Sequence, residues 1–167
     1  MAVINMLPQG SGVNAKGFEV TPWFVKGIVY NSDIFGVPTF YTQTNARVNS
    51  DTYATDGYIH TNYTSTGFSA TDITTGNYLP TTYDFALIRL KNIRSVSDAY
   101  ALALGTTNTR SDITRSLYRW VNTNASEDVW LTIPLNVFNT LGVSEYLGLG
   151  GSTETYIYEI YFMKAKQ

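Results

Sequence analysis

The feature that most constrains this chain is the alternation of apolar and polar residues in short segments bounded by glycine, asparagine or aspartate. An alternation of period two places apolar side chains on one face of a β-strand and polar side chains on the other. Segments 83–91, 113–121 and 129–134 show this pattern over most of their length. Because strands recur without the helical spacing of βαβ units, the pattern predicts an antiparallel all-β fold.

Within this class we expect a β-sandwich of jelly-roll type with about eight strands. The other expected strands lie at 17–25, continuing through 27–30 after a kink at Gly27, and at 37–41, 57–63, 97–104 and 154–164. Residues 97–104 fit either a strand or two helical turns, and the flanking strands favour a strand. The rest of 45–82 is expected to be mostly loop, 135–141 a short helical turn, and 148–151 a turn.

Two sets of positions follow from the alternation. Side chains expected to be largely buried are Phe18, Val20, Phe85, Leu87, Leu117, Leu131, Tyr158 and Ile160. In the last strand, strict alternation predicts that Tyr156, Tyr158, Ile160 and Phe162 share one face.

The 167 residues suit one domain, which we place at 17–167, preceded by an N-terminal arm at 1–16. The arm carries four apolar residues, Val3, Ile4, Met6 and Leu7, ahead of Pro8 and a Gly-Ser-Gly spacer. A segment this short cannot build its own core. We therefore expect it to anchor the domain to a neighbouring subunit or a capsid surface, with an extra edge strand on its own domain as the alternative. No signal peptide is expected, because the opening lacks a basic region followed by an apolar run.

The low charge of the chain limits the classes of partner that we expect it to bind. The net charge is −2 and 14% of residues are charged, against about 25% in typical soluble domains. A nucleic-acid partner is not expected, because it would require a basic face. A membrane partner is not expected either, because no apolar run approaches the length of a transmembrane helix. Low charge is typical of proteins held in permanent assemblies.

The residues that usually carry catalysis or bind metals are scarce. The chain has one histidine, His60, and no cysteine, so neither a zinc site nor a Ser–His–acid triad is expected. Residues 49–51 and Asp56 offer oxygen ligands for calcium, but the full loop pattern is absent and ordinary turns use the same residues. Nucleotide-binding motifs are also missing. We expect a non-enzymatic protein without metal or cofactor.

Aromatic residues make up 14% of the chain and give the main functional signal. Tyrosine and tryptophan suit a core, a subunit interface or a surface on which sugars stack. Because binding sites concentrate in loops, the candidate ligand-binding aromatics are those of the loop-rich middle: Tyr53, Tyr58, Tyr63 and Tyr78.

Two segments carry a resemblance to a known group of proteins. Residues 4–12 read INMLPQGSG and residues 156–166 read YIYEIYFMKAK. Together with the Thr- and Tyr-rich body, these resemble the N-terminal segments and closing strands of phage capsid-decoration, head-fibre and tail-fibre proteins. The resemblance implies a virion structural protein that forms homo-oligomers, commonly trimers, and contacts other virion proteins. The alternative is a carbohydrate-binding module or receptor-binding head that recognises cell-surface glycans.

Overall fold

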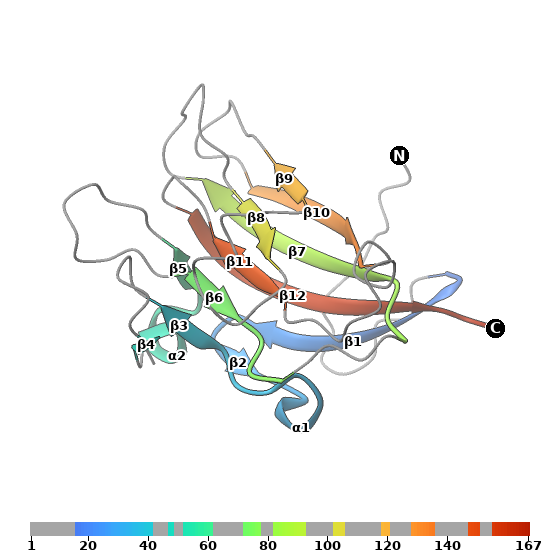
Figure 1. Cartoon of the computed structure of the whole chain (residues 1–167), viewed down its shortest axis with the longest axis horizontal. Coiled ribbons are helices and arrows are strands. Elements are labelled where there is room, and N and C mark those ends of the chain that lie inside the picture. Colours follow the sequence, from blue (N-terminus) through green and yellow to red (C-terminus); the bar gives the residue numbers. More distant parts are fainter. Residues whose placement is uncertain are drawn as a thin grey trace.

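The computed structural model describes residues 16–41, 47–48, 52–61, 72–77, 82–92, 102–105, 118–120, 128–135, 147–150 and 155–167. These ranges hold twelve strands, all paired antiparallel, and two helices of four and five residues (Figure 1). The all-β prediction is confirmed. Within the described ranges, no helix has the length and hydropathy needed to cross a membrane.

The first sheet has six strands, with β12(Thr155–Ala165) at its centre. The strands β7(Phe85–Asn92) and then β10(Asp128–Pro134) follow on one side of β12. On its other side, β1(Phe18–Val25) pairs with the C-terminal part of β12 and β5(Ile59–Thr61) with its N-terminal part. The edge strand β2(Ile28–Val29) pairs with β1. The predicted strands at 129–134 and 154–164 are therefore confirmed.

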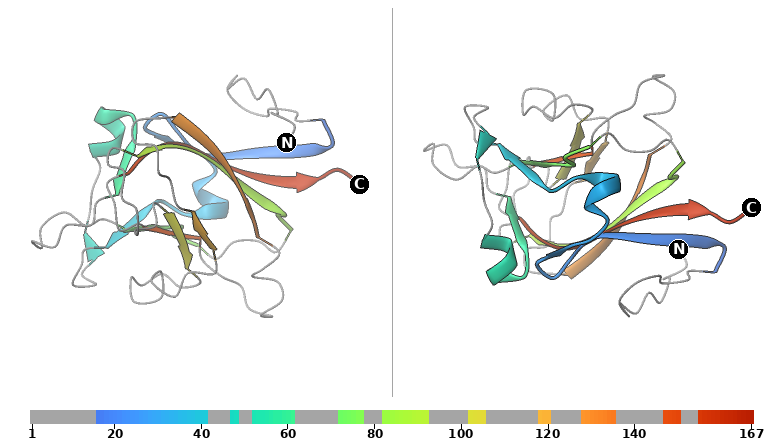
Figure 2. Two further views of the ribbon diagram at one scale, coloured as in Figure 1. Left: turned by 90° about the horizontal axis from the view of Figure 1, so that it is seen from above. Right: turned by 90° about the horizontal axis from the view of Figure 1, so that it is seen from below.

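The second sheet consists of short strands and lies across one face of the first (Figure 2). Its order is β4(Arg47–Val48), β3(Thr39–Tyr41), β6(Asp72–Thr74), β11(Gly148–Gly150), β8(Leu102–Gly105) and β9(Tyr118–Trp120). The turn predicted at 148–151 is wrong, because Leu149 pairs with Ile73 on one side and Leu104 on the other. Strands this short hold too few alternations to be recognised from sequence.

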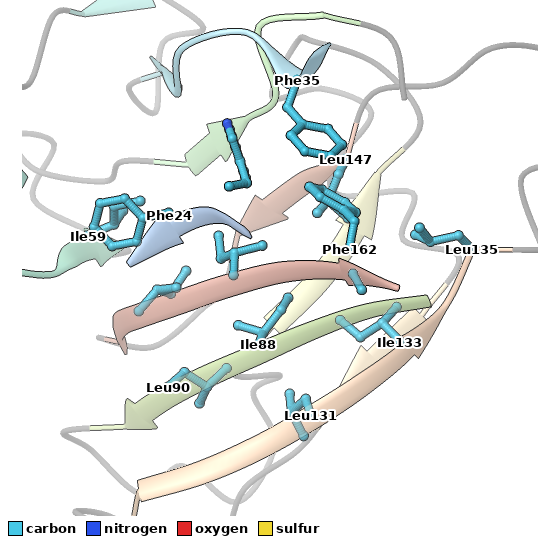
Figure 3. Close-up of a cluster of buried hydrophobic side chains, with 14 of the residues drawn as sticks. Phe24, Phe35, Ile59, Ile88, Leu90, Leu131, Ile133, Leu135, Leu147 and Phe162 are labelled. Carbon is cyan, nitrogen blue, oxygen red and sulfur yellow. The ribbon is translucent and has the colours of Figure 1, made fainter. Parts of the chain in front are cut away.

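The main core contains side chains from the first sheet and from segments facing it. Figure 3 shows Ile88, Leu90, Leu131 and Ile133 on the same side of the first sheet as Phe162. Facing them are Phe35 of helix α1(Ser32–Phe35), Phe40 of β3 and Leu147. The region 45–82 is not mostly loop in its described part, since it contains helix α2(Thr52–Asp56) and β6.

A one-residue bulge in β12 changes which of its side chains face the core. Ile157 lies opposite Leu90, but Glu159 lies opposite the next residue of β7, Arg89, so Tyr158 is the extra residue. Because one extra residue reverses the alternation, Ile157 joins Ile160 and Phe162 in the core. The predicted shared face of Tyr156, Tyr158, Ile160 and Phe162 is therefore wrong.

The segment predicted to continue through a kink at Gly27 instead reverses direction. Val25 pairs with Ile28, so Lys26 and Gly27 form a two-residue hairpin turn. Both have positive φ, 47° and 89°, which is the backbone shape that matches the twist of the flanking strands.

Burial agrees only in part with the expected set. Val20, Leu87, Leu131 and Ile160 are buried. Phe18, Phe85 and Tyr158 are partly exposed, and Leu117 lies outside the described residues. So do residues 136–141 of the expected helical turn, of which only Leu135 is described and is buried.

A close crossing links α1 to the segment that follows β6. The Trp23 indole N–H donates to the carbonyl oxygen of Gly36 at 2.9 Å, and the backbone N–H of Asn77 donates to the carbonyl of Phe35 at 3.1 Å. Buried Thr75 donates its backbone N–H to the Leu147 carbonyl at 3.0 Å and accepts the Leu147 N–H on its hydroxyl at 3.1 Å. The bonds of Trp23 and Asn77 thus link β1 of the first sheet through α1 to the segment after β6. The bonds between Thr75 and Leu147 join the residues that flank β6 and β11 in the second sheet.

Candidate functional site

The candidate site lies on the face of the first sheet opposite the main core, which we call the second face. Register places directly opposed residues of neighbouring strands beside one another on this face. One row contains Trp130, Arg89 and Glu159. The next row runs Asp128, Lys91, Tyr156 and His60 across four strands. Charged and aromatic side chains therefore gather at one end of the second face.

The other end of the second face is apolar. Val20, Leu87, Tyr161 and Met163 form a buried cluster separate from the main core. Phe18, Val25 and Phe85 pack against it as partly buried residues. The first sheet therefore buries apolar side chains on both faces, although its strands alternate as if one face were polar.

Arg89 connects two carboxylates of the polar end. One guanidinium nitrogen lies 3.0 Å from Oε1 of Glu159 and another lies 2.8 Å from Oδ2 of Asp128. The Glu159 side chain is fully buried, whereas that of Asp128 is 47% exposed. The Tyr161 hydroxyl donates to the second Glu159 oxygen at 2.7 Å. Both oxygens of Glu159 are thus occupied by protein donors.

The ionisation of these groups follows from their contacts. The hydrogen bond to Asp128 is the largest cause that raises the pKa of Arg89, so its guanidinium is permanently cationic. Burial, followed by the hydrogen bond to Glu159, raises the pKa of Tyr161, which keeps this hydroxyl protonated and able to donate. Burial also raises the pKa of Tyr158.

A chain of ring contacts begins at Arg89. Its guanidinium carbon lies 5.5 Å from the ring centroid of Tyr158. The Tyr158 ring meets Tyr58 edge to face at 5.9 Å, and Tyr58 stacks on Tyr156 at 4.3 Å. His60 meets Tyr156 edge to face at 5.0 Å. We call Arg89, Tyr158, Tyr58, Tyr156 and His60 the tyrosine ladder; each is partly exposed.

Local backbone features bring the ladder together. The bulge places Tyr158 between the rows of regular pairing, and bulges commonly redirect a side chain in this way. Pairing of β5 with the start of β12 sets His60 opposite Tyr156. Tyr58 precedes β5 and follows Gly57, whose φ of 79° ends helix α2.

The structure separates the aromatics that the sequence singled out. Tyr58 belongs to the ladder. Tyr53 lies in α2 and packs on core rings, with centroids 5.7 Å from both Phe24 and Phe40. Six other candidates lie outside the described residues: Val3, Ile4, Met6, Leu7, Tyr63 and Tyr78.

Sequence reasoning missed the part of the ladder that comes from β7 and β12. Alternation places Tyr156 and Tyr158 on one face of a strand, and it gives Arg89, within the strand expected at 83–91, no role in a site. The available signal was the pair of tyrosines two residues apart, which points two rings to one side of a regular strand.

The arrangement is suited to binding through ring faces and hydrogen bonds. Aromatic rings, an arginine and flanking charged groups at the end of one sheet are features of recognition surfaces. In the described ranges, no group of three or more histidine, aspartate or glutamate side chains gathers as a metal site would require. Comparisons of the chain with protein-family models, curated proteins and solved structures find no match.

Proposed function

We propose that this chain is a non-enzymatic structural protein of a virus particle, a capsid-decoration or fibre component that acts by binding and assembly. The observation that carries the proposal is the second face, where a buried apolar cluster adjoins partly exposed aromatics and a bridged arginine. Interfaces between proteins are enriched in tyrosine, tryptophan and arginine. Trp130, which is 39% exposed, adds an aromatic side chain to this face. The proposed partners are further copies, with a trimer favoured, and other virion proteins.

The same proposal assigns residues 1–16 as an anchoring arm. Val3, Ile4, Met6 and Leu7 would dock on a neighbouring subunit or capsid surface, with Gly10 and Gly12 as the hinge. Full burial of one such side chain contributes about 1.5–3 kcal/mol. Four such side chains would together contribute about 6–12 kcal/mol before the entropy of ordering the arm is subtracted.

For the domain we propose a β-sandwich of jelly-roll type. Supporting this, Phe40 and Leu147 share one buried cluster with Ile88, Ile160 and other side chains of the first sheet. Two sheets whose inner faces supply one core is the defining feature of a sandwich.

Deleting residues 1–12 tests the assembly role. We expect the shortened chain to keep its β-type far-UV spectrum and its melting temperature while its mass in solution falls to that of a monomer. A matched full-length variant, Ile4→Asp with Leu7→Asp, should behave in the same way. Unfolding of the shortened chain would assign the arm to the core, and an unchanged oligomer would reject anchoring by the arm.

A second candidate function is recognition of cell-surface glycans by the domain as a receptor-binding head. The tyrosine ladder is the observation that favours it, because partly exposed rings flanked by polar groups suit sugars as well as proteins.

A further inference from the structure

We infer that the tyrosine ladder is a binding platform for neutral pyranose rings of a glycan. The inference rests on the second candidate function and adds to it the location of the site and the class of sugar.

The ring contacts supply the apolar half of sugar recognition. The face of a tyrosine ring carries partial negative charge, and the C–H groups on one side of a pyranose carry partial positive charge, so the two attract when stacked. Tyr58 and Tyr156 cover one face of each other at a centroid distance of 4.3 Å. Arg89 lies over the Tyr158 ring, so the faces that could stack on a sugar are the outer ones. All three tyrosines are partly exposed.

The rings are held before any ligand arrives. Tyr156 and Tyr158 belong to the central strand of the sheet, and Tyr58 is fixed by its stack on Tyr156. Arg89 over the ring of Tyr158 is itself tied to two carboxylates. Because little side-chain freedom remains to be lost, a ligand pays a small entropic cost on binding.

Polar groups beside the rings supply the hydrogen-bonding half. Asp128 keeps 47% of its side chain exposed beyond its contact with Arg89, so its carboxylate has further acceptor capacity for sugar hydroxyls. Lys91 and His60 lie in the same cross-strand row as Asp128 and Tyr156. The platform thus has donors and acceptors on both flanks of the rings.

The charges select a neutral sugar over an acidic one. Recognition of a carboxylate or phosphate favours an arginine whose planar fork is open to it. The Arg89 fork is already engaged by Glu159 at 3.0 Å and Asp128 at 2.8 Å. Lys91 lies opposite Asp128 in the cross-strand row and offsets the charge of that carboxylate, so the engaged fork of Arg89 carries the selectivity. Sialylated glycans and nucleic acids are therefore disfavoured at the ladder.

The test is a glycan array that carries neutral hexose- and N-acetylhexosamine-terminated glycans beside their sialylated forms, probed with the full chain. The best neutral hit is then titrated by NMR against the parent and its variants. We expect Tyr58→Ala and Tyr158→Ala each to weaken binding about tenfold. Tyr158→Phe, which keeps the ring, should remain within about twofold of the parent, and Asp128→Asn should weaken binding severalfold.

Controls separate this inference from the assembly role. Ile28→Ala alters a side chain that is 54% exposed on edge strand β2 and should leave glycan binding unchanged. Each variant is checked by thermal melting and by mass in solution, and Tyr58→Ala, outside the strands, serves if Tyr158→Ala unfolds. Failure of the parent to bind any neutral glycan at about 10 mM, a preference for sialylated forms, or full binding by Tyr58→Ala overturns the inference. An unchanged oligomer in those cases leaves the structural role intact.

Discussion

Alanine at Gly76 should destabilise the fold because the chain crosses itself at this residue. An added Cβ would lie 2.7 Å from the carbonyl oxygen of Val37 and 3.1 Å from Cα of Gly36. In proteins, a Cβ atom essentially never lies within 3.0 Å of another residue's heavy atom, as it would here from the Val37 oxygen. Both neighbours are backbone atoms, which no change of side-chain rotamer can move. Hydrogen bonds on both sides hold the crossing, from Trp23 to Gly36 and from Asn77 to Phe35.

The expected loss of stability has two causes, backbone strain and steric overlap, and alanine substitutions at different glycines separate them. Gly36 combines a φ of 73° with a 2.5 Å approach of its added Cβ to Cα of Gly76. Gly17 has a φ of 85° with nothing within 4 Å, so alanine there tests backbone strain alone. Left-handed backbone costs a non-glycine residue about 1–2 kcal/mol. Gly36, with a ψ of 177°, lies instead in a region essentially restricted to glycine, where the cost is about 1–3 kcal/mol. Overpacking adds about 1–3 kcal/mol, so we expect losses of about 1–2 kcal/mol for Gly17→Ala, about 1–3 for Gly76→Ala and about 2–6 for Gly36→Ala.

Urea unfolding followed by far-UV circular dichroism measures these differences. The slope with denaturant should stay constant across the three variants, because the fold and the surface exposed on unfolding are unchanged. If Gly36→Ala lowers the free energy of unfolding no more than Gly17→Ala does, the crossing is loosely packed and the steric reasoning is refuted.

Three further predictions concern the second face. Arg89→Ala should lower the free energy of unfolding by about 3 kcal/mol, because it removes the charged partner of the buried Glu159 carboxylate. Asp128→Asn, at the exposed end of the same bridge, should lower it by less than about 1 kcal/mol. Equal losses for the two variants in denaturant titrations would contradict the burial of Glu159. Because the pKa of Tyr161 is raised in the folded state, its contribution to stability is complete below pH 10.0, the ordinary value, and declines as the unfolded chain ionises above it. Between pH 9 and 12, the melting temperature of Tyr161→Phe should therefore fall less steeply than that of the parent. Equal slopes of melting temperature against pH would contradict the raised pKa of Tyr161. Leu87→Asp should cost several kcal/mol, since a side chain only 6% exposed would become an unpaired buried charge; a variant that melts like the parent would place Leu87 at the surface.

The local sequence pattern was sufficient to locate the longest β-strands. Strands β10 and β12, of seven and eleven residues, follow from long runs of strand-forming residues, although the bulge at Tyr158 interrupts the alternation of β12. The short strands β6 and β11 could not be found in the same way. Leu149 becomes a strand residue only because Ile73 and Leu104, distant in sequence, pair with it.

The candidate site, too, could be predicted only in part from local sequence. Composition and turn signals pointed to Tyr58 as a candidate, and no local rule distinguished it from Tyr53, whose ring packs on the core. Tyr58 meets Tyr156 only because β5 pairs with the start of β12.

By itself, the sequence determined the all-β class, the positions of the long strands and the scarcity of charge, because these depend on the period and composition of contiguous residues. Only the tertiary structure decided which face each side chain of β12 occupies. The bulge at Tyr158 shifts the register by one residue and so places Glu159 beside Arg89 and Ile157 in the core. A register shift is set by pairing with neighbouring strands, and the free energy of that pairing comes from contacts that no local segment contains.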